Sequence, residues 1–177
     1  MTRSIEERLQ HIEDIDAIRR LKSRYCLYAD DPRKGAEFAD LFTDDAVLDE
    51  GEDLMVVHGR RRIRAMHAAL WPCLRLNQHF AFSPVIEIDG DDATGHWRLL
   101  QISTVVTDDG DEKAFWSCGW YEENYVRESG IWKIRHVVAR VHFSCPYEDG
   151  WAKTPFGEFL SAEALDRILG AIEEQSA

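Results

Sequence analysis

The sequence has few cysteines, no long apolar run and too few basic residues to balance its acidic ones. Its four cysteines are far apart and form no Cys-x-x-Cys pair, so we expect neither a disulfide framework nor a structural zinc site. No apolar run approaches the ~20 residues that span a bilayer. The 21 lysines and arginines against 33 aspartates and glutamates give a formal net charge of −12, which repels nucleic acid and anionic lipid surfaces.

Motifs of several large enzyme classes are also missing. The chain has no phosphate-binding glycine loop, no Gly-x-Gly-x-x-Gly after a strand, no His-Glu-x-x-His and no Gly-x-Ser-x-Gly, so nucleotide-dependent, zinc-protease and serine-hydrolase chemistry are not expected. The seven histidines show no metal-ligand spacing with cysteines or carboxylates, and we expect no metal and no other cofactor. The charged amino terminus, MTRSIEERLQ, lacks the apolar segment of a secretory signal. We therefore expect a cytoplasmic protein.

The first part of the chain has the apolar periodicity of helices. Over residues 4–29 apolar side chains recur at steps of three or four, which predicts one long helix with an apolar stripe. Ser4 and Glu7 form a capping-box start, and Pro32 ends the helix near Asp30. Shorter elements are expected next, namely a helix over 35–42, strands over 46–48 and 54–57, and a helix over 59–70.

The second half is rich in β-forming residues that alternate with turn sequences. The connections Asp-Gly-Asp, Thr-Asp-Asp-Gly-Asp and Glu-Ser-Gly have hairpin length. Helices followed by hairpin-linked strands predict an α+β domain whose sheet curls over the helices, and no linker or repeat divides residues 1–177 into two domains. The expected strands are 79–88, 93–107, 113–126 and 132–143, followed by a helix over about 158–174.

Several segments, taken in order, resemble a known family. They are Ile15–Tyr25 with Asp30 after it, Asn77–His79 leading into Pro84–Gly90, Ala93–Trp97, and Gly119–Tyr121 through Tyr125 to Ser129–Ile134. Over about residues 8–145 these segments are similar to the SnoaL-like (polyketide-cyclase-like) branch of the nuclear transport factor two-like superfamily. The resemblance implies a curved, mixed sheet wrapped around the N-terminal helices to form a cone with one deep apolar pocket.

Within this branch the chain is most similar to bile-acid dehydratase, scytalone dehydratase and hexachlorocyclohexane dehydrochlorinase, which are lyases without a cofactor. The resemblance implies a catalytic pair formed by Asp30 and His79, and it places the tyrosine of the dehydratases at Tyr25. An aspartate bonded to one ring nitrogen fixes the imidazole tautomer and leaves the other nitrogen free to take a proton from carbon. A phenol can hydrogen-bond the oxygen of an enolate or of a leaving hydroxyl.

Further candidate residues lie on the later strands. The resemblance implies an arginine that holds the substrate or the leaving group, and Arg140 is the candidate for it. By alternation His136 and His142 share a face of the last strand with Arg140. Gln101 stands where bile-acid dehydratase has a further aspartate, which puts the substrate of that enzyme in doubt for this chain. The Gln101 side chain can hydrogen-bond a carbonyl but cannot act as a base.

Each of these residues also has a structural interpretation. Trp97 and Trp120 fit a pocket for a flat hydrophobic ligand or a plain core. Asp31 is a rival to Asp30, and Tyr25 fits a core position with a bonded hydroxyl. The four arginines within residues 60–64 are typical of a solvated helix face, although they also suit an anionic substrate.

The first functional hypothesis is a lyase or isomerase without a cofactor that acts on a small hydrophobic ring compound. In it His79 removes a proton from carbon, Asp30 orients His79, and Tyr25 and Arg140 bind the oxygen or the leaving group. A second hypothesis is a non-catalytic scaffold similar to the small subunits of ring-hydroxylating dioxygenases, which lack the histidine–aspartate pair. A third is a binding protein for a hydrophobic ligand. The resemblance also implies a homo-oligomer, a trimer or a dimer, without nucleic-acid or membrane partners.

Overall fold

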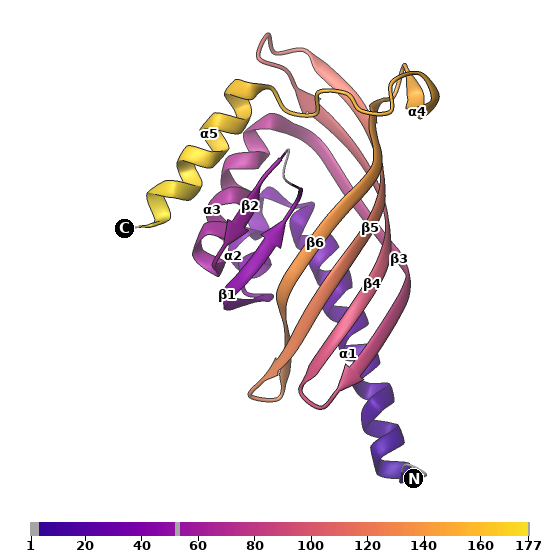
Figure 1. The fold of residues 1–177 in the computed structure, drawn as a ribbon. Helices are drawn as coiled ribbons and strands as arrows, with labels where there is room; N and C mark the ends of the chain where they lie inside the picture. Colours follow the sequence, from indigo (N-terminus) through magenta and orange to yellow (C-terminus); the bar gives the residue numbers. More distant parts are fainter. Residues whose placement is uncertain (1–3, 52–53, 177) are drawn as a thin grey trace.

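The computed structural model describes residues 4–51 and 54–176. Helical elements are α1 (Ile5–Ala29), α2 (Gly35–Ala39), α3 (Arg60–Leu70), α4 (Gly150–Lys153) and α5 (Ala162–Glu173), with 3-10 turns at Pro32–Lys34, Trp71–Cys73 and Glu174–Ser176. The strands are β1 (Phe42–Asp49), β2 (Val56–His58), β3 (Leu74–Asp89), β4 (Asp92–Val106), β5 (Glu112–Glu128) and β6 (Ile131–Pro146). Figure 1 shows the long, bent strands β3 to β6 with α1 behind them and α2, α3 and α5 beside them.

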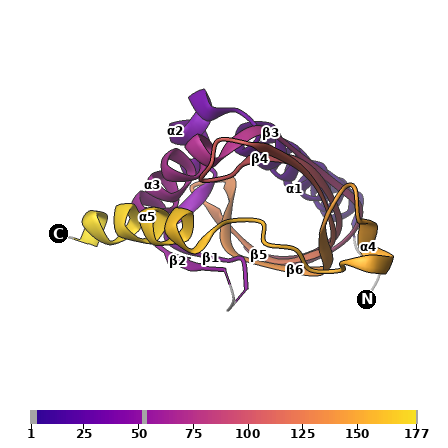
Figure 2. The same cartoon turned by 90° about the horizontal axis from the view of Figure 1, so that it is seen from above.

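The six strands form one mixed sheet with the order β2-β1-β6-β5-β4-β3. Strands β3 to β6 form an antiparallel meander, whereas β1 runs parallel to β6 and antiparallel to β2. Within the described residues no pairing joins β2 to β3, so the sheet stays open. Viewed from above, it curls from β3 round to β6 (Figure 2). The prediction of an α+β fold with a curved mixed sheet is confirmed.

The two faces of the sheet differ in burial. Along β4 and β5 the side chains of Trp97, Leu99, Tyr121 and Tyr125 are buried on the face that packs against α1. Because successive strand residues point to opposite faces, the residues between them lie on the other side. We call the face that packs against α1 the concave face and the other one the convex face.

Helix α1 begins at the predicted capping box, in which the Ser4 hydroxyl accepts from the backbone N–H of Glu7 and the Glu7 carboxylate accepts from that of Ser4. The stripe is buried in the second half of the helix, where Ile18, Leu21 and Tyr25 contact the core. In the first half Ile5, Leu9 and Ile12 are exposed, because this half extends past the hairpin ends of the sheet (Figure 1). None of the helices in the described ranges combines the length and apolar character needed to cross a bilayer.

Several expected boundaries differ from the structure, and two of them have clear physical causes. The helix predicted over 35–42 ends at Ala39, because the next residues join the sheet: the N–H of Ile134 donates to the carbonyl of Leu41, and Phe42 pairs with Ile134. The last helix begins at Ala162 rather than at about residue 158, since the Ser161 hydroxyl caps it by accepting from the N–H of Ala164 at 3.1 Å. The four cysteines are free thiols.

Candidate active site

The end of α1 and the beginning of β3 bring Asp30 and His79 together. His79 Nδ1 lies 2.5 Å from Asp30 Oδ1, and the backbone N–H of His79 donates to Asp30 Oδ2 at 2.8 Å. Both carboxylate oxygens therefore bind the same residue, one through its ring and one through its backbone. The side chains are 12% and 11% exposed, so the pair is shielded but still reachable.

This contact fixes the tautomer of the imidazole. An ionised carboxylate only accepts hydrogen bonds, so the proton of the neutral ring must be on Nδ1. Nε2 then carries the lone pair, and within the described part of the chain no hydrogen bond occupies it. The arrangement suits a general base that accepts a proton at Nε2 while Asp30 stabilises the resulting imidazolium.

The neighbouring aspartate faces a different partner. Asp31 accepts from the backbone N–H and from the guanidinium of Arg33, and it caps the 3-10 turn that begins at Pro32. The hydrogen bonds from Arg33 lower the pKa of Asp31. Asp31 therefore belongs to a local surface cap, whereas Asp30 contacts His79.

Two tyrosines adjoin the pair. The ring centroids of Tyr25 and Tyr121 are 5.9 Å apart, and those of Tyr25 and His79 are 6.5 Å apart in an edge-on arrangement. Both phenols are buried, and this burial raises the pKa of each well above its usual value. They therefore stay neutral, and the Tyr121 hydroxyl hydrogen-bonds the oxygen of Tyr25.

A buried cation lies beneath these phenols. The Lys22 ammonium is 3.3 Å from the ring centroid of Tyr121 and 3.9 Å from that of Tyr25, and it forms an ion pair with the buried carboxylate of Glu123. The second Glu123 oxygen accepts from the Tyr125 hydroxyl. The attraction between the ammonium group and the two ring faces stabilises the positions of both tyrosine rings.

The indole of Trp97 belongs to the same hydrogen-bond network. The indole N–H of Trp97 donates to the Tyr125 hydroxyl oxygen at 2.9 Å. The side chain is on the concave face but is 4% exposed. Trp97 therefore supports the floor beneath the phenols, and its polar atom is engaged.

Glu50 is, besides Tyr121, a site residue that sequence reasoning missed. It directly follows β1, in which Ala46 and Leu48 are buried while Asp49 pairs with Arg140. Alternation therefore turns Glu50 toward the concave side. Burial raises the pKa of the Glu50 carboxyl, against the opposing charges of His79 and Lys22. The alternation of β1 was the available signal, but the run Asp49-Glu50-Gly51-Glu52-Asp53 has the composition of a solvated loop.

The strand register places a row of polar side chains beside His79. His79 pairs with Gln101, Gln101 with Ser117, and Ser117 with Ser144 across β3 to β6. The Gln101 amide donates to Asn77 Oδ1 at 2.7 Å. Gln101 is therefore held next to the dyad, on the same face of the sheet.

Comparison with known protein families identifies the family of this fold. A model described as a SnoaL-like domain matches residues 10–138. The chain belongs to the SnoaL-like family. Type 2 hexachlorocyclohexane dehydrochlorinase has a similar solved structure, with 21% identity, a TM-score of 0.70, and coverage of 78% of this chain and 91% of that one.

Two further structures similar to this SnoaL-like protein come from Novosphingobium aromaticivorans. One is a scytalone dehydratase candidate with 19% identity, a TM-score of 0.70, and coverage of 77% of this chain and 89% of that one. The other is an aromatic ring hydroxylase candidate with 23% identity and a TM-score of 0.69. The match covers 78% of this chain and 96% of that one. At these identities the likeness establishes the shared fold. The predicted family and fold are confirmed.

Four residues predicted for the site of this SnoaL-like protein lie on the convex face instead. Trp120 pairs with Arg140 and Asn124 with His136, and both β5 residues alternate with the buried Tyr121. The His142 ring lies 4.8 Å from that of Trp120. The structure therefore does not bring Trp120, His136, Arg140 and His142 to the dyad.

The reason is an irregular register in β6. Trp132 and Ile134 point to the concave face, and simple alternation would place His136 and Arg140 there too. A bulge opposite Asn124 and Tyr125 inserts one extra residue and reverses the alternation. Arg140 then makes a bidentate ion pair with Asp49, with both N–O distances at 2.9 Å.

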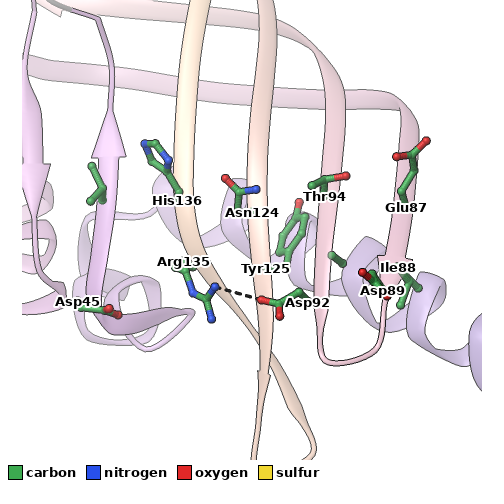
Figure 3. Close-up of a pocket in the computed structure, with 12 residues that line it drawn as sticks. Asp45, Glu87, Ile88, Asp89, Asp92, Thr94, Asn124, Tyr125, Arg135 and His136 are labelled. Carbon is green, nitrogen blue, oxygen red and sulfur yellow. Dashed lines mark hydrogen bonds and ion pairs between the residues drawn. The ribbon is translucent and has the colours of Figure 1, made fainter.

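A hollow of about 800 Å³ lies on this convex face. Figure 3 shows His136, Asn124, Thr94 and Glu87 in a row across its strands, with Arg135 bonded to Asp92 at 3.0 Å. Its lining is largely polar, unlike the deep apolar pocket that the resemblance implies. In the part of the chain that the structure describes, no three His, Cys, Asp or Glu side chains are arranged to hold a metal ion.

Proposed function

We propose that this SnoaL-like protein is a lyase or isomerase without a cofactor, acting on a hydrophobic ring compound. The observation that carries the proposal is the His79–Asp30 contact, in which one carboxylate binds both the ring Nδ1 and the backbone N–H of the same histidine. Such a pair is a base of fixed orientation. The similar structures of a dehydrochlorinase and a dehydratase candidate support the reaction class.

The reaction begins when His79 Nε2 takes a proton from a carbon next to a carbonyl group. The C–H electron pair moves into the carbonyl, giving an enolate, and the imidazolium is stabilised by Asp30. From a β,γ-unsaturated ketone the enolate is a dienolate, and return of the proton at its γ carbon completes an isomerisation. Loss of a group from the β carbon completes an elimination.

The oxygen that becomes negative is bound by the phenol hydroxyl of Tyr25, which Tyr121 supports through its own hydroxyl. Both are neutral donors, because burial raises the pKa of each phenol. Hydrogen bonds to a developing oxyanion are strongest where water is excluded. The buried floor around Lys22 and Trp97 supplies that environment.

Deuterium exchange tests the proton-abstraction step without knowledge of the natural substrate. With 1-indanone or 1-tetralone in D2O at neutral pH, we expect the protein to accelerate exchange at the α carbon by about 10²-fold or more, the range of general base catalysis. His79→Ala should return the rate to that of buffer while circular dichroism stays native. Equal rates for the wild type and His79→Ala would refute His79 as the base.

We also propose that copies of this chain associate through the convex face of β3. Leu76, Phe80, Phe82 and Val85 are 43–62% exposed, and β3 is an edge strand. A row of exposed apolar side chains on an edge strand is typical of an interface.

Light scattering tests this association directly. The wild type should have a mass of two or three times 20.4 kDa, and the double variant Phe80→Ser/Phe82→Ser should be monomeric. The single variant Glu87→Gln, on the same strand, serves as the control and should keep the wild-type mass. A monomeric wild type at millimolar concentration would refute the proposal.

A further inference from the structure

Glu50 is a carboxyl group at the candidate site that the proton-abstraction step does not use. The turn after β1 holds it in place: its backbone N–H donates to the carbonyl of Met55 at 3.0 Å, and the N–H of Gly51 donates to Asp49 Oδ1 at 2.8 Å. Gly51 has φ of 106°, a conformation that favours glycine. The chain therefore turns sharply just beyond Glu50.

Charged and titratable groups approach Glu50 from every neighbouring element. Those that interact with it are Lys22 and Tyr25 on α1, His79 on β3, Tyr121 on β5, Asp49 on β1 and Arg140 on β6. Lys22 is already bound to Glu123, and Arg140 to Asp49. No hydrogen bond to the Glu50 carboxyl occurs among the described residues.

We infer that Glu50 is the general acid that protonates a leaving hydroxyl, so that the elimination at this site is a dehydration of a β-hydroxy carbonyl compound. The inference rests on the proposed function, because it needs the enolate that His79 generates. It goes beyond that function by assigning a proton donor and by choosing water as the group that leaves.

The bonds and protons of this step balance. His79 Nε2 takes the α proton to give the enolate. The carbonyl then re-forms, and the enolate electron pair becomes the new carbon–carbon double bond as the β C–O bond breaks. Glu50 gives its proton to the departing oxygen, which leaves as water. The imidazolium proton then returns through water to the Glu50 carboxylate, which restores both groups.

A carboxylic acid suits hydroxide as a leaving group. Hydroxide departs poorly unless it is protonated, whereas halide and carboxylate groups depart as stable anions. Burial raises the pKa of the Glu50 carboxyl, which increases its protonated fraction. A protonated carboxyl and a neutral imidazole in one site form an acid–base pair with distinct roles.

The test compares two leaving groups on one carbon skeleton. The probes are 4-hydroxy-4-phenylbutan-2-one and its 4-acetoxy analogue, both of which give the same conjugated ketone, measured by its ultraviolet absorbance. Glu50→Gln should slow the loss of water by about 10²-fold to 10³-fold and the loss of acetate by less than tenfold. Glu87→Gln, a carboxyl on the convex face, should match the wild type on both.

The pH profile separates an acid from a structural residue. In the wild type the loss of water should fall as pH rises, because Glu50 loses the proton that it must donate. This fall should be absent for the acetate probe, and Glu50→Asp should restore part of the dehydration that Glu50→Gln removes. If Glu50 had a purely structural role, Glu50→Gln would slow elimination from both probes together and would leave the shape of the pH profile unchanged.

The outcomes also separate this inference from the proposed function. If the wild type eliminates acetate or exchanges α protons but does not lose water, Glu50 is not the acid and the base mechanism stands. If Glu50→Gln slows the loss of water and the loss of acetate by equal factors, the inference is overturned as well. If the wild type neither eliminates nor exchanges, both proposals fail.

Discussion

Asp30→Asn should lower the rate of α-proton exchange and of elimination by about 10³-fold to 10⁴-fold, comparable to losses seen when an orienting aspartate becomes asparagine. The reason is the tautomer of His79. An asparagine side chain can donate its amide N–H to Nδ1, which places the ring proton on Nε2. The nitrogen that must accept the substrate proton is then already protonated. The measurement is the exchange rate with 1-indanone in D2O.

Asp31→Asn is the matched control for this prediction. Asp31 is adjacent in sequence, but its hydrogen bonds go to Arg33 at the surface. Exposed ion pairs contribute little to stability, and the asparagine oxygen can still cap the 3-10 turn. We therefore expect its rates to stay within about twofold of the wild type, the effect of a change remote from the reaction. The reverse ranking of the two variants would assign the orienting role to Asp31.

Local sequence patterns predicted most of the secondary structure because their causes are local. The capping box at Ser4, the stop at Pro32 and the hairpin turns depend on residues close together in sequence. The two-residue turn at Ser129 and Gly130 has φ of 49° and 82°, the positive values that a tight hairpin requires. Contacts distant in sequence changed the remaining boundaries, as where β6 extends β1 back to Phe42.

The site was predictable where a family resemblance supplied the pairing. Asp30 and His79 are 49 residues apart, so periodicity alone could not join them. Arg140 and His136 were expected near the dyad, but an extra residue in β6 turned them to the convex face. A one-residue bulge has no clear signal in the sequence, yet it reverses the side chains that follow it up to the next register shift, opposite Cys118 and Gly119.

Glu50 and Lys22 show a second limit of sequence reasoning. Glu50 lies in an acidic run, which normally indicates a solvated loop, and its placement depends on the alternation of a strand whose bounds were predicted too short. Lys22 lies three residues before Tyr25, and its partner Glu123 is 101 residues away. The sequence therefore gave no reason to bury this charge.

Lys22→Met should have the largest effect on stability, lowering the free energy of unfolding by about 3–5 kcal/mol, the cost of breaking a buried ion pair. The Glu123 carboxylate is 2% exposed, and without Lys22 it would keep the hydroxyl of Tyr125 as its partner but lose its countercharge. An uncompensated charge in the interior costs far more than the attraction that a paired one provides. Urea unfolding of the wild type and of Lys22→Met at pH 7 measures the difference in their free energies of unfolding.

Two further variants decide whether the missing countercharge is the cause. Lys22→Met combined with Glu123→Gln removes both charges, so it should recover most of the stability lost by the single change. Arg20→Met, on the same helix, breaks the exposed pair between Arg20 and Asp16 and should cost less than about 1 kcal/mol. If the double variant is no more stable than Lys22→Met, the lysine acts through its packing against Tyr25 and Tyr121 rather than through its charge on Glu123.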